Sequence, residues 1–198
     1  MKKVLLVFVL FASCFSNTMY LNKNINIKLE NKVIANAILL SPVNVLDKSG
    51  DIYKVEIVGY VNSNYQEEIV KGITQSERYA CFHDTSEKVT YKGDKNPYIN
   101  IIEKVEDDYG DVWYKVSIRF EVTSSDLVQN VNGLHNEARI LYEQSCSSCH
   151  HLHDTKEYTV SQWPSSFESM VGSGFVELDE EDKLLIIKYL QQNAKDVK

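Results

Sequence analysis

The chain has 198 residues, of which 43% are hydrophobic and 25% are charged, and its formal net charge at pH 7 is −7. This length is enough for one large or two small hydrophobic cores. The acidic balance argues against binding to nucleic acid or to an anionic membrane surface, and suits a soluble protein that docks on a partner with a basic patch.

The first residues have the features of an export signal. Lys2 and Lys3 precede a nine-residue apolar run over 4–12, which is too short to cross a bilayer, since a span needs about 20 residues. We expect residues 1–16 to be a signal peptide and the protein to be periplasmic. Two processing routes stay open: ordinary cleavage near Cys14, or lipoprotein processing at Cys14 that leaves a lipid anchor at a membrane.

Strands are predicted from about residue 28 to residue 122, within a β-rich domain over 17–130. Apolar and polar residues alternate at period two over 52–61 and again over 112–122, and both stretches contain the triplet Tyr-Lys-Val. Each stretch follows a similar apolar run and a turn rich in aspartate and glycine, which is typical of hairpins. An internal duplication, as in two SH3-like units, is one interpretation, and coincidence between β-rich sequences is the other. Cys81 has no evident disulfide partner and is interpreted as a buried small side chain.

Residues 131–198 change to a helical pattern. An amphipathic helix is expected over about 134–144, and a second one from the acidic turn at 179–182 to about Ala194, with Asp179 as its cap. The predicted fold class is therefore α+β with two domains: a β-rich domain over 17–130 and a small all-α domain over 131–198.

The sequence Cys146-Ser147-Ser148-Cys149-His150 is the attachment signature of a c-type haem. Both cysteines can reach the vinyl groups of one porphyrin, and His150 is then held beneath the iron as its proximal ligand. Two other interpretations of the cysteine pair lack what they require. A zinc site would need a second pair of ligands, and none follows Cys149. A thioredoxin-like pair would need alternating strands and helices around it, and this alternation is missing. We expect one covalently bound haem c.

The distal iron ligand is assigned to Met170, the single methionine of residues 131–198. A thioether on the distal face raises the reduction potential, as an electron carrier requires. His135 on the preceding helix, or an open site, is the alternative. Trp163 and Tyr158 are interpreted either as hydrogen-bond donors to the haem propionates or as packing residues.

The stretch 138–153, together with Gln162-Trp163-Pro164 and Met170, resembles the C-terminal monohaem domain of the pentahaem cytochromes that serve periplasmic trimethylamine N-oxide reductases. The resemblance implies an all-α cytochrome c domain that carries electrons and performs no catalysis. The acceptor it implies is a molybdenum enzyme that reduces N- or S-oxides such as trimethylamine N-oxide or dimethyl sulfoxide. By position, it assigns Cys146 and Cys149 to the haem, His150 to the proximal site and Met170 to the distal site.

The membrane-anchored tetrahaem portion of those cytochromes, which takes electrons from quinol, has no counterpart in this sequence. A separate quinol-linked or cytochrome donor is therefore expected. Alternative functions are a general periplasmic electron carrier and a haem-based sensor or regulatory module, of which the sensor requires an open or labile distal site. A peroxidase-like enzyme would need a vacant distal site and a catalytic base or arginine, for which only Arg139 precedes the motif.

Overall fold

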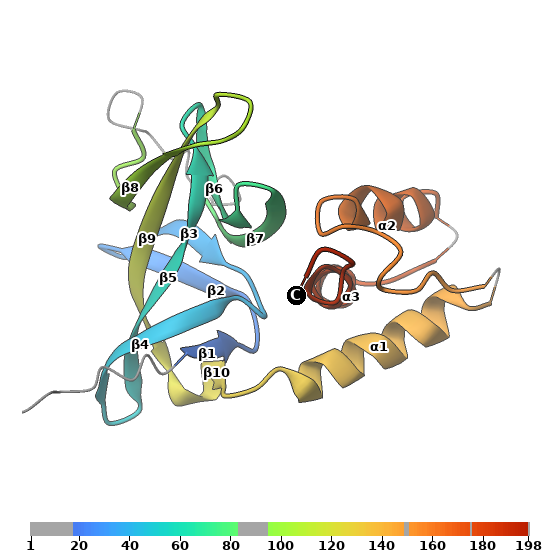
Figure 1. Cartoon of the computed structure of the whole chain (residues 1–198). Helices are drawn as coiled ribbons and strands as arrows, with labels where there is room; N and C mark the ends of the chain where they lie inside the picture. Colours follow the sequence, from blue (N-terminus) through green and yellow to red (C-terminus); the bar gives the residue numbers. More distant parts are fainter. Residues whose placement is uncertain (1–17, 83–94, 149–150, 175, 198) are drawn as a thin grey trace, which may run out of the picture.

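The computed structural model describes residues 18–82, 95–148, 151–174 and 176–197. Within them, ten strands form one antiparallel sheet that curves into a half-barrel, and three helices lie on one side of it (Figure 1). The strands in chain order are β1 (Thr18–Leu21), β2 (Ile25–Leu29), β3 (Lys32–Ala37), β4 (Pro42–Ser49), β5 (Ile52–Asn62), β6 (Tyr65–Gly72), β7 (Gln75–Cys81), β8 (Asn100–Glu106), β9 (Val112–Thr123) and β10 (Leu127–Val128). The helices are α1 (Asn132–Cys146), α2 (Trp163–Val171) and α3 (Glu180–Gln192).

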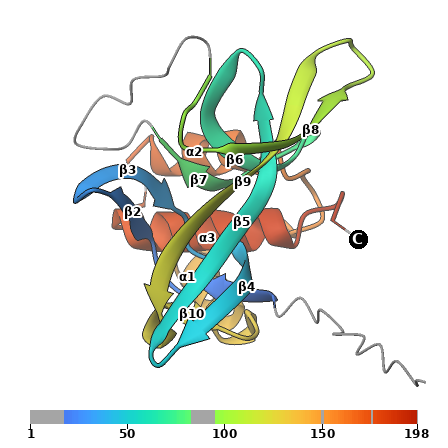
Figure 2. The same ribbon diagram turned by 90° about the vertical axis from the view of Figure 1, so that its left-hand side faces the viewer.

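The long strand β5 organises the sheet (Figure 2). It pairs with β4 at its start and with β6 at its end, and with β9 along its whole length. From β4 the sheet continues through β1 to β10, and from β6 it continues through β7 and β3 to β2, while β8 pairs with β9. Two arms therefore extend from the ends of β5, and their curvature produces the half-barrel.

The period-two pattern of the sequence sets which side of β5 is buried. Val55, Ile57 and Val61 have no exposed surface and contribute to the main apolar core, while the residues that alternate with them point to the other side and are only partly buried. Gly59 occupies the inward position between Ile57 and Val61, where a β carbon would lie 2.5 Å from the carbonyl oxygen of Val70 on β6. Any larger residue at position 59 would push β6 away from β5.

The two stretches that look alike in sequence form two hairpins, β4–β5 and β8–β9, with the same pairing. In the first hairpin the register shifts between Val45 and Asp47, and in the second it shifts between Ile101 and Glu103. The extra residues, Leu46 and Ile102, occupy the same place in the repeat and are 48% and 50% exposed. Both hairpins thus carry a β-bulge at the same point.

The two hairpins join through a direct pairing of β5 with β9. Ile57 lies opposite Ile118, and these residues are separated by the same 61 positions as the two Tyr-Lys-Val triplets. The equivalent strands therefore meet about an approximate two-fold axis. Because one continuous sheet contains both copies, the interpretation as two SH3-like barrels is wrong.

The helices begin and end near the predicted places, and one of them was not predicted. Asp179 caps α3, because its carboxylate accepts a hydrogen bond from the backbone N–H of Asp182 at 2.8 Å. The unpredicted helix α2 begins with Trp163 and Pro164, and proline is favoured in a first helical turn because its missing N–H has no partner there. Among the described residues, no helix is long and apolar enough to cross a membrane.

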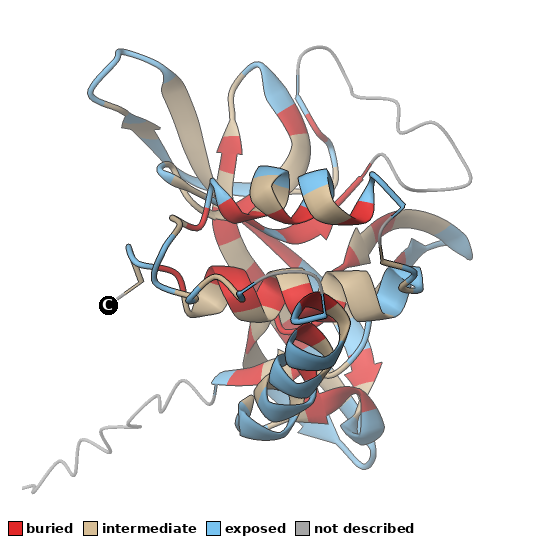
Figure 3. Ribbon diagram, turned by 90° about the vertical axis from the view of Figure 1, so that its right-hand side faces the viewer, coloured by how far each residue is buried: buried red, intermediate tan, exposed pale blue. Residues whose placement is uncertain are grey.

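The predicted fold class needs a correction. The described chain is predominantly β with three helices, and no separate small all-α cytochrome c domain is evident. The physical reason is that the helices share a core with the strands: Leu39 and Leu40, which follow β3, pack against Ala138 of α1 and Leu185 of α3. Figure 3 shows the result, with α3 buried on several sides and α1 exposed along its outer side.

Candidate functional site

Cys146, the first cysteine of the predicted haem motif, ends helix α1 and faces inward. Ala138, Tyr142 and Cys146 follow one another at intervals of four residues, so they lie on one face of α1. All three are buried, and the Cys146 side chain lies at the end of this stripe with only 6% of the residue exposed. The helix therefore delivers the thiol into the interior and not to solvent.

The surroundings of Cys146 are apolar. Cys146 belongs to a cluster of buried side chains from the three helices, the segment between α1 and α2 and the residues after α3. The members of this cluster are Tyr142, Cys146, Val160, Trp163, Phe167, Val171, Ile186, Leu190 and Ala194. Burial raises the pKa of the Cys146 thiol, and burial together with the neighbouring Cys146 raises the pKa of Tyr142 to about 12. The cluster therefore favours neutral forms of both groups. We call it the Cys146 cluster.

The segment after the haem motif is fixed by hydrogen bonds to the same cluster. The hydroxyl of Tyr142 donates to the carbonyl oxygen of His153 at 3.1 Å, and the indole N–H of Trp163 donates to the carbonyl oxygen of Thr155 at 3.0 Å. The ring of Tyr158 stands edge-on against Trp163, with centroids 4.8 Å apart. Since the Trp163 N–H already has an acceptor and its side chain is fully buried, Trp163 is a packing residue here and not a donor to a propionate.

Of the other predicted haem residues, the structure describes only Met170. Cys149 and His150 lie outside the described residues. Met170 is half-buried on α2, three residues after Phe167 and seven after Trp163, and the helical period places it on the same face as these two residues. Its assignment as the distal ligand stays a prediction.

His135, the alternative distal ligand, has a different environment. Its Nε2 lies 2.8 Å from Oε1 of Gln192, and its ring stands edge-on against Tyr189. It precedes Cys146 by eleven residues on the same helix, which corresponds to about 16 Å along the axis. This position argues against His135 as an iron ligand.

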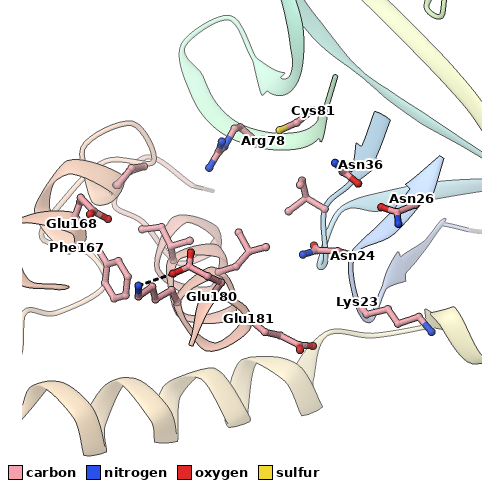
Figure 4. Close-up of a pocket in the computed structure, with 15 residues that line it drawn as sticks. Lys23, Asn24, Asn26, Asn36, Arg78, Cys81, Phe167, Glu168, Glu180 and Glu181 are labelled. Atoms are coloured by element: carbon pink, nitrogen blue, oxygen red, sulfur yellow. Dashed lines mark hydrogen bonds and ion pairs between the residues drawn. The ribbon is translucent and has the colours of Figure 1, made fainter. Parts of the chain in front are cut away.

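A cleft of about 790 Å³ opens between the strands and the helices (Figure 4). Arg78 and Asn24 line its sheet side, and Phe167, Glu168 and Glu180 line its helix side. Neither Cys146 nor Met170 is among its described lining residues. This cleft is therefore separate from Cys146 and Met170, the two predicted haem residues that the structure describes.

The sequence did not reveal the charged contact beneath α3. Lys188 is 2% exposed and lies 2.7 Å from the carboxylate of Glu77 on β7, which is 1% exposed. One signal was available: Lys188 interrupts the apolar run 184–190, and a helix that is apolar on most sides is buried on most sides. A lysine in such a helix needs a carboxylate partner.

The apolar surroundings of Cys146 fit a covalently attached haem. Among the described residues, no group of three histidine, cysteine, aspartate or glutamate side chains could hold a metal ion. The Cys146 thiol, in contrast, lies within an apolar cluster of large side chains, which is the environment that a flat apolar macrocycle requires. The residues present therefore fit the cofactor that the motif predicts.

Comparison with known proteins supports this assignment at the level of a distant relationship. The chain is 26% identical over 157 residues to the cytochrome c-type protein TorC of Escherichia coli K12, and equally to that of Escherichia coli O157:H7. The chain is a distant relative of a c-type cytochrome. The match covers 79% of this chain but only 38% of TorC, so the chain spans well under half the length of these relatives.

The alignment with TorC supports the relationship to a TorC-like cytochrome that the sequence suggested. It does not establish the number of haems. No protein-family model matches the chain. No solved structure matches it.

Proposed function

We propose that this chain is a periplasmic c-type cytochrome with one covalent haem, which transfers electrons and is not an enzyme. The observation that carries the proposal is the burial of Cys146 at the end of α1, within an apolar cluster and three residues before Cys149, which His150 follows. The relationship to TorC, a cytochrome c-type protein, also supports it.

The proposed roles follow from the chemistry of each side chain. Cys146 and Cys149 would each form a thioether with a vinyl group of the haem, a step that adds the thiol across the double bond and needs no oxidant. His150 would bind the iron on one face and Met170 on the other. The bound haem would supply a centre that accepts and returns one electron.

The protein around this centre would set its potential. Large apolar side chains such as Trp163 and Leu190 exclude water, and a dry environment disfavours the extra charge of the ferric state. The Met170 thioether stabilises ferrous iron in the same direction. Both effects suit a carrier that accepts electrons readily and passes them to an acceptor of higher potential.

The proposed acceptor is a periplasmic molybdenum enzyme that reduces N- or S-oxides. The family resemblance supports this class of partner, and the acidic net charge suits docking on a basic surface. A quinol-linked protein or another cytochrome would supply the electrons.

The test is reoxidation of the purified ferrous protein by the molybdenum reductase of the same organism, followed through the haem absorbance. We expect oxidation that depends on added trimethylamine N-oxide or dimethyl sulfoxide. If the reductase turns over with an artificial donor but leaves this protein reduced, the proposed partner is wrong. That result would leave the haem assignment untouched, because covalent haem in the purified protein is detected separately, by its absorbance.

The distal ligand is tested by Met170→Ala. We expect the haem to stay attached, the midpoint potential to fall by part of the roughly 0.8 V range that axial ligands span, and carbon monoxide to bind the ferrous protein. Met19→Leu, which changes a buried methionine on β1, is the matched control and should leave the potential unchanged. An unaltered potential and spectrum in Met170→Ala would exclude Met170 as the ligand.

A further inference from the structure

A buried ion pair connects α3 to the sheet. The ammonium of Lys188 donates to Oε1 of Glu77 at 2.7 Å and to the carbonyl oxygen of Arg78 at 3.0 Å, and it lies 5.2 Å from the centre of the Tyr79 ring. Both charged side chains are almost fully buried. Burying two charges is unfavourable unless the pair is close and well hydrogen-bonded, so this contact holds its two elements at a defined separation.

Glu77 also connects to the haem-bearing helix through Gln192. The amide nitrogen of Gln192 donates to Oε1 of Glu77 at 2.8 Å and to the carbonyl oxygen of Leu40 at 3.0 Å. Its amide oxygen must therefore accept from Nε2 of His135 on α1, 2.8 Å away. One chain of hydrogen bonds thus runs from β7 through α3 to α1.

The turn that receives Gln192 has an unusual backbone conformation. Leu40 has φ of +60°, in the left-handed region that a leucine rarely adopts. Its N–H donates to the carbonyl oxygen of Leu21 at 2.7 Å, and its own carbonyl oxygen accepts from Gln192. The sheet therefore holds a strained residue where it contacts the helices.

The opposite side of α3 faces the Cys146 cluster. Ile186 and Leu190 belong to that cluster, and each is two residues from Lys188, which places the lysine on the far side of the helix. The distance between α3 and the sheet consequently determines how closely Ile186 and Leu190 approach Cys146.

We propose that Lys188 and Glu77 are positioning residues, which hold α3 so that its apolar side closes over the haem attached at Cys146 and keeps external ligands from the iron. This inference rests on the proposed function, because it presupposes the haem. Burial alone would raise the pKa of Glu77. The charge and hydrogen bond of Lys188, the hydrogen bond from Gln192 and the charge of Lys71, 3.5 Å away, together outweigh burial and lower the pKa, so the carboxylate stays ionised beside Lys188.

The test uses the full chain carrying its haem, with Glu77→Gln, Lys188→Met and the double variant. Lys183→Met and Glu180→Gln are matched controls, because Lys183 and Glu180 form a pair of the same 2.7 Å length on the exposed side of α3. Three properties are measured in each protein: the rate of carbon monoxide binding to the ferrous haem, the midpoint potential, and amide hydrogen exchange in α3.

We expect each single substitution at the buried pair to accelerate carbon monoxide binding at least about tenfold, to lower the potential and to speed exchange in α3. The double variant should regain most of the wild-type behaviour, because no unpaired charge then remains buried. The control variants should match the wild type in all three properties.

The proposal is overturned if the single variants are folded, hold haem and match the wild type in carbon monoxide binding and potential. If Glu77→Gln does not accumulate, Glu77→Asp keeps the charge but withdraws it by one methylene, and it must show the same changes to a smaller degree. A wild-type protein without covalent haem would instead refute the proposed function. The two failures are therefore distinguishable.

Discussion

The two sides of α3 are buried by different means. Toward the Cys146 cluster the helix presents Ile186 and Leu190, which contact other apolar side chains. Toward the sheet it presents Lys188 and Gln192, which make hydrogen bonds of 2.7–3.0 Å to β7 and to the turn after β3. Apolar contacts have no preferred direction, whereas charge-assisted hydrogen bonds do. The comparison indicates that the sheet side fixes where α3 lies, whereas the other side contributes apolar surface to the Cys146 cluster.

The largest effect is expected on the apolar side, where the cofactor would be attached. The double substitution Cys146→Ser, Cys149→Ser removes both thiols, so no haem should be covalently bound. After acidic organic extraction of the protein, haem staining of a denaturing gel should show no signal. Cys81→Ser is the control, because Cys81 is also a buried cysteine but lies on β7. Full staining of the double variant would refute covalent attachment.

A second change weakens the apolar side without touching the thiols. Leu190→Ala removes a fully buried side chain and should lower the free energy of unfolding by about 2–5 kcal/mol, because a cavity remains. Leu184→Ala changes the same residue type at a half-buried position of α3 and should cost less than about 1.5 kcal/mol. Equal losses in denaturant titrations of the two variants would mean that the Cys146 cluster does not stabilise α3.

The sheet side should differ from the apolar side in its response to acid. Burial opposes ionisation of Glu77, yet Lys188 and the hydrogen bond from Gln192 leave its pKa below the ordinary value. A lowered carboxyl pKa gives stability that is present above the ordinary value of about 4.3 and is lost as the pH falls through the folded value. The wild type should thus lose about 1–3 kcal/mol more unfolding free energy than Glu77→Gln, Lys188→Met between about pH 6 and 3.

Urea titrations at several pH values measure this difference. Leu190→Ala serves as the reference, because it leaves the ion pair intact and should follow the pH dependence of the wild type. Identical pH profiles for the wild type and the double variant would show that Glu77 does not carry the acid sensitivity of the sheet side.

Several local features could be predicted from sequence because their causes are local. The alternation at 52–61 predicts a strand with one buried side, and β5 covers that stretch with Val55, Ile57 and Val61 inward. The acidic turn at 179–182 predicts the start of α3, and Asp179 caps it. The identical bulges of the two hairpins also follow from the repeated sequence, since each copy contains its own turn and strands.

The all-α second domain was a wrong prediction because it depended on contacts between distant segments. The helical pattern after residue 130 shows which residues are apolar but not what covers them. In the folded protein, Leu39 and Leu40 pack against Ala138 and Leu185, so strand and helix segments share one cluster. The charge of Lys188 is compensated by Glu77, 111 residues earlier in the chain, and no local pattern could have paired them.

The amino-acid sequence by itself determined the haem motif and the strand and helix periods, because each depends on spacings of a few residues along the chain. It also showed the internal repeat, because two segments 61 positions apart have similar residues in the same order. Only the tertiary structure decided that Cys146 is buried, that His135 is bound to Gln192 and that α3 is held between the sheet and the Cys146 cluster. The physical reason is that α3 is apolar on most sides and must be covered both toward the sheet and toward the Cys146 cluster. Which residues cover it depends on how the whole sheet curves.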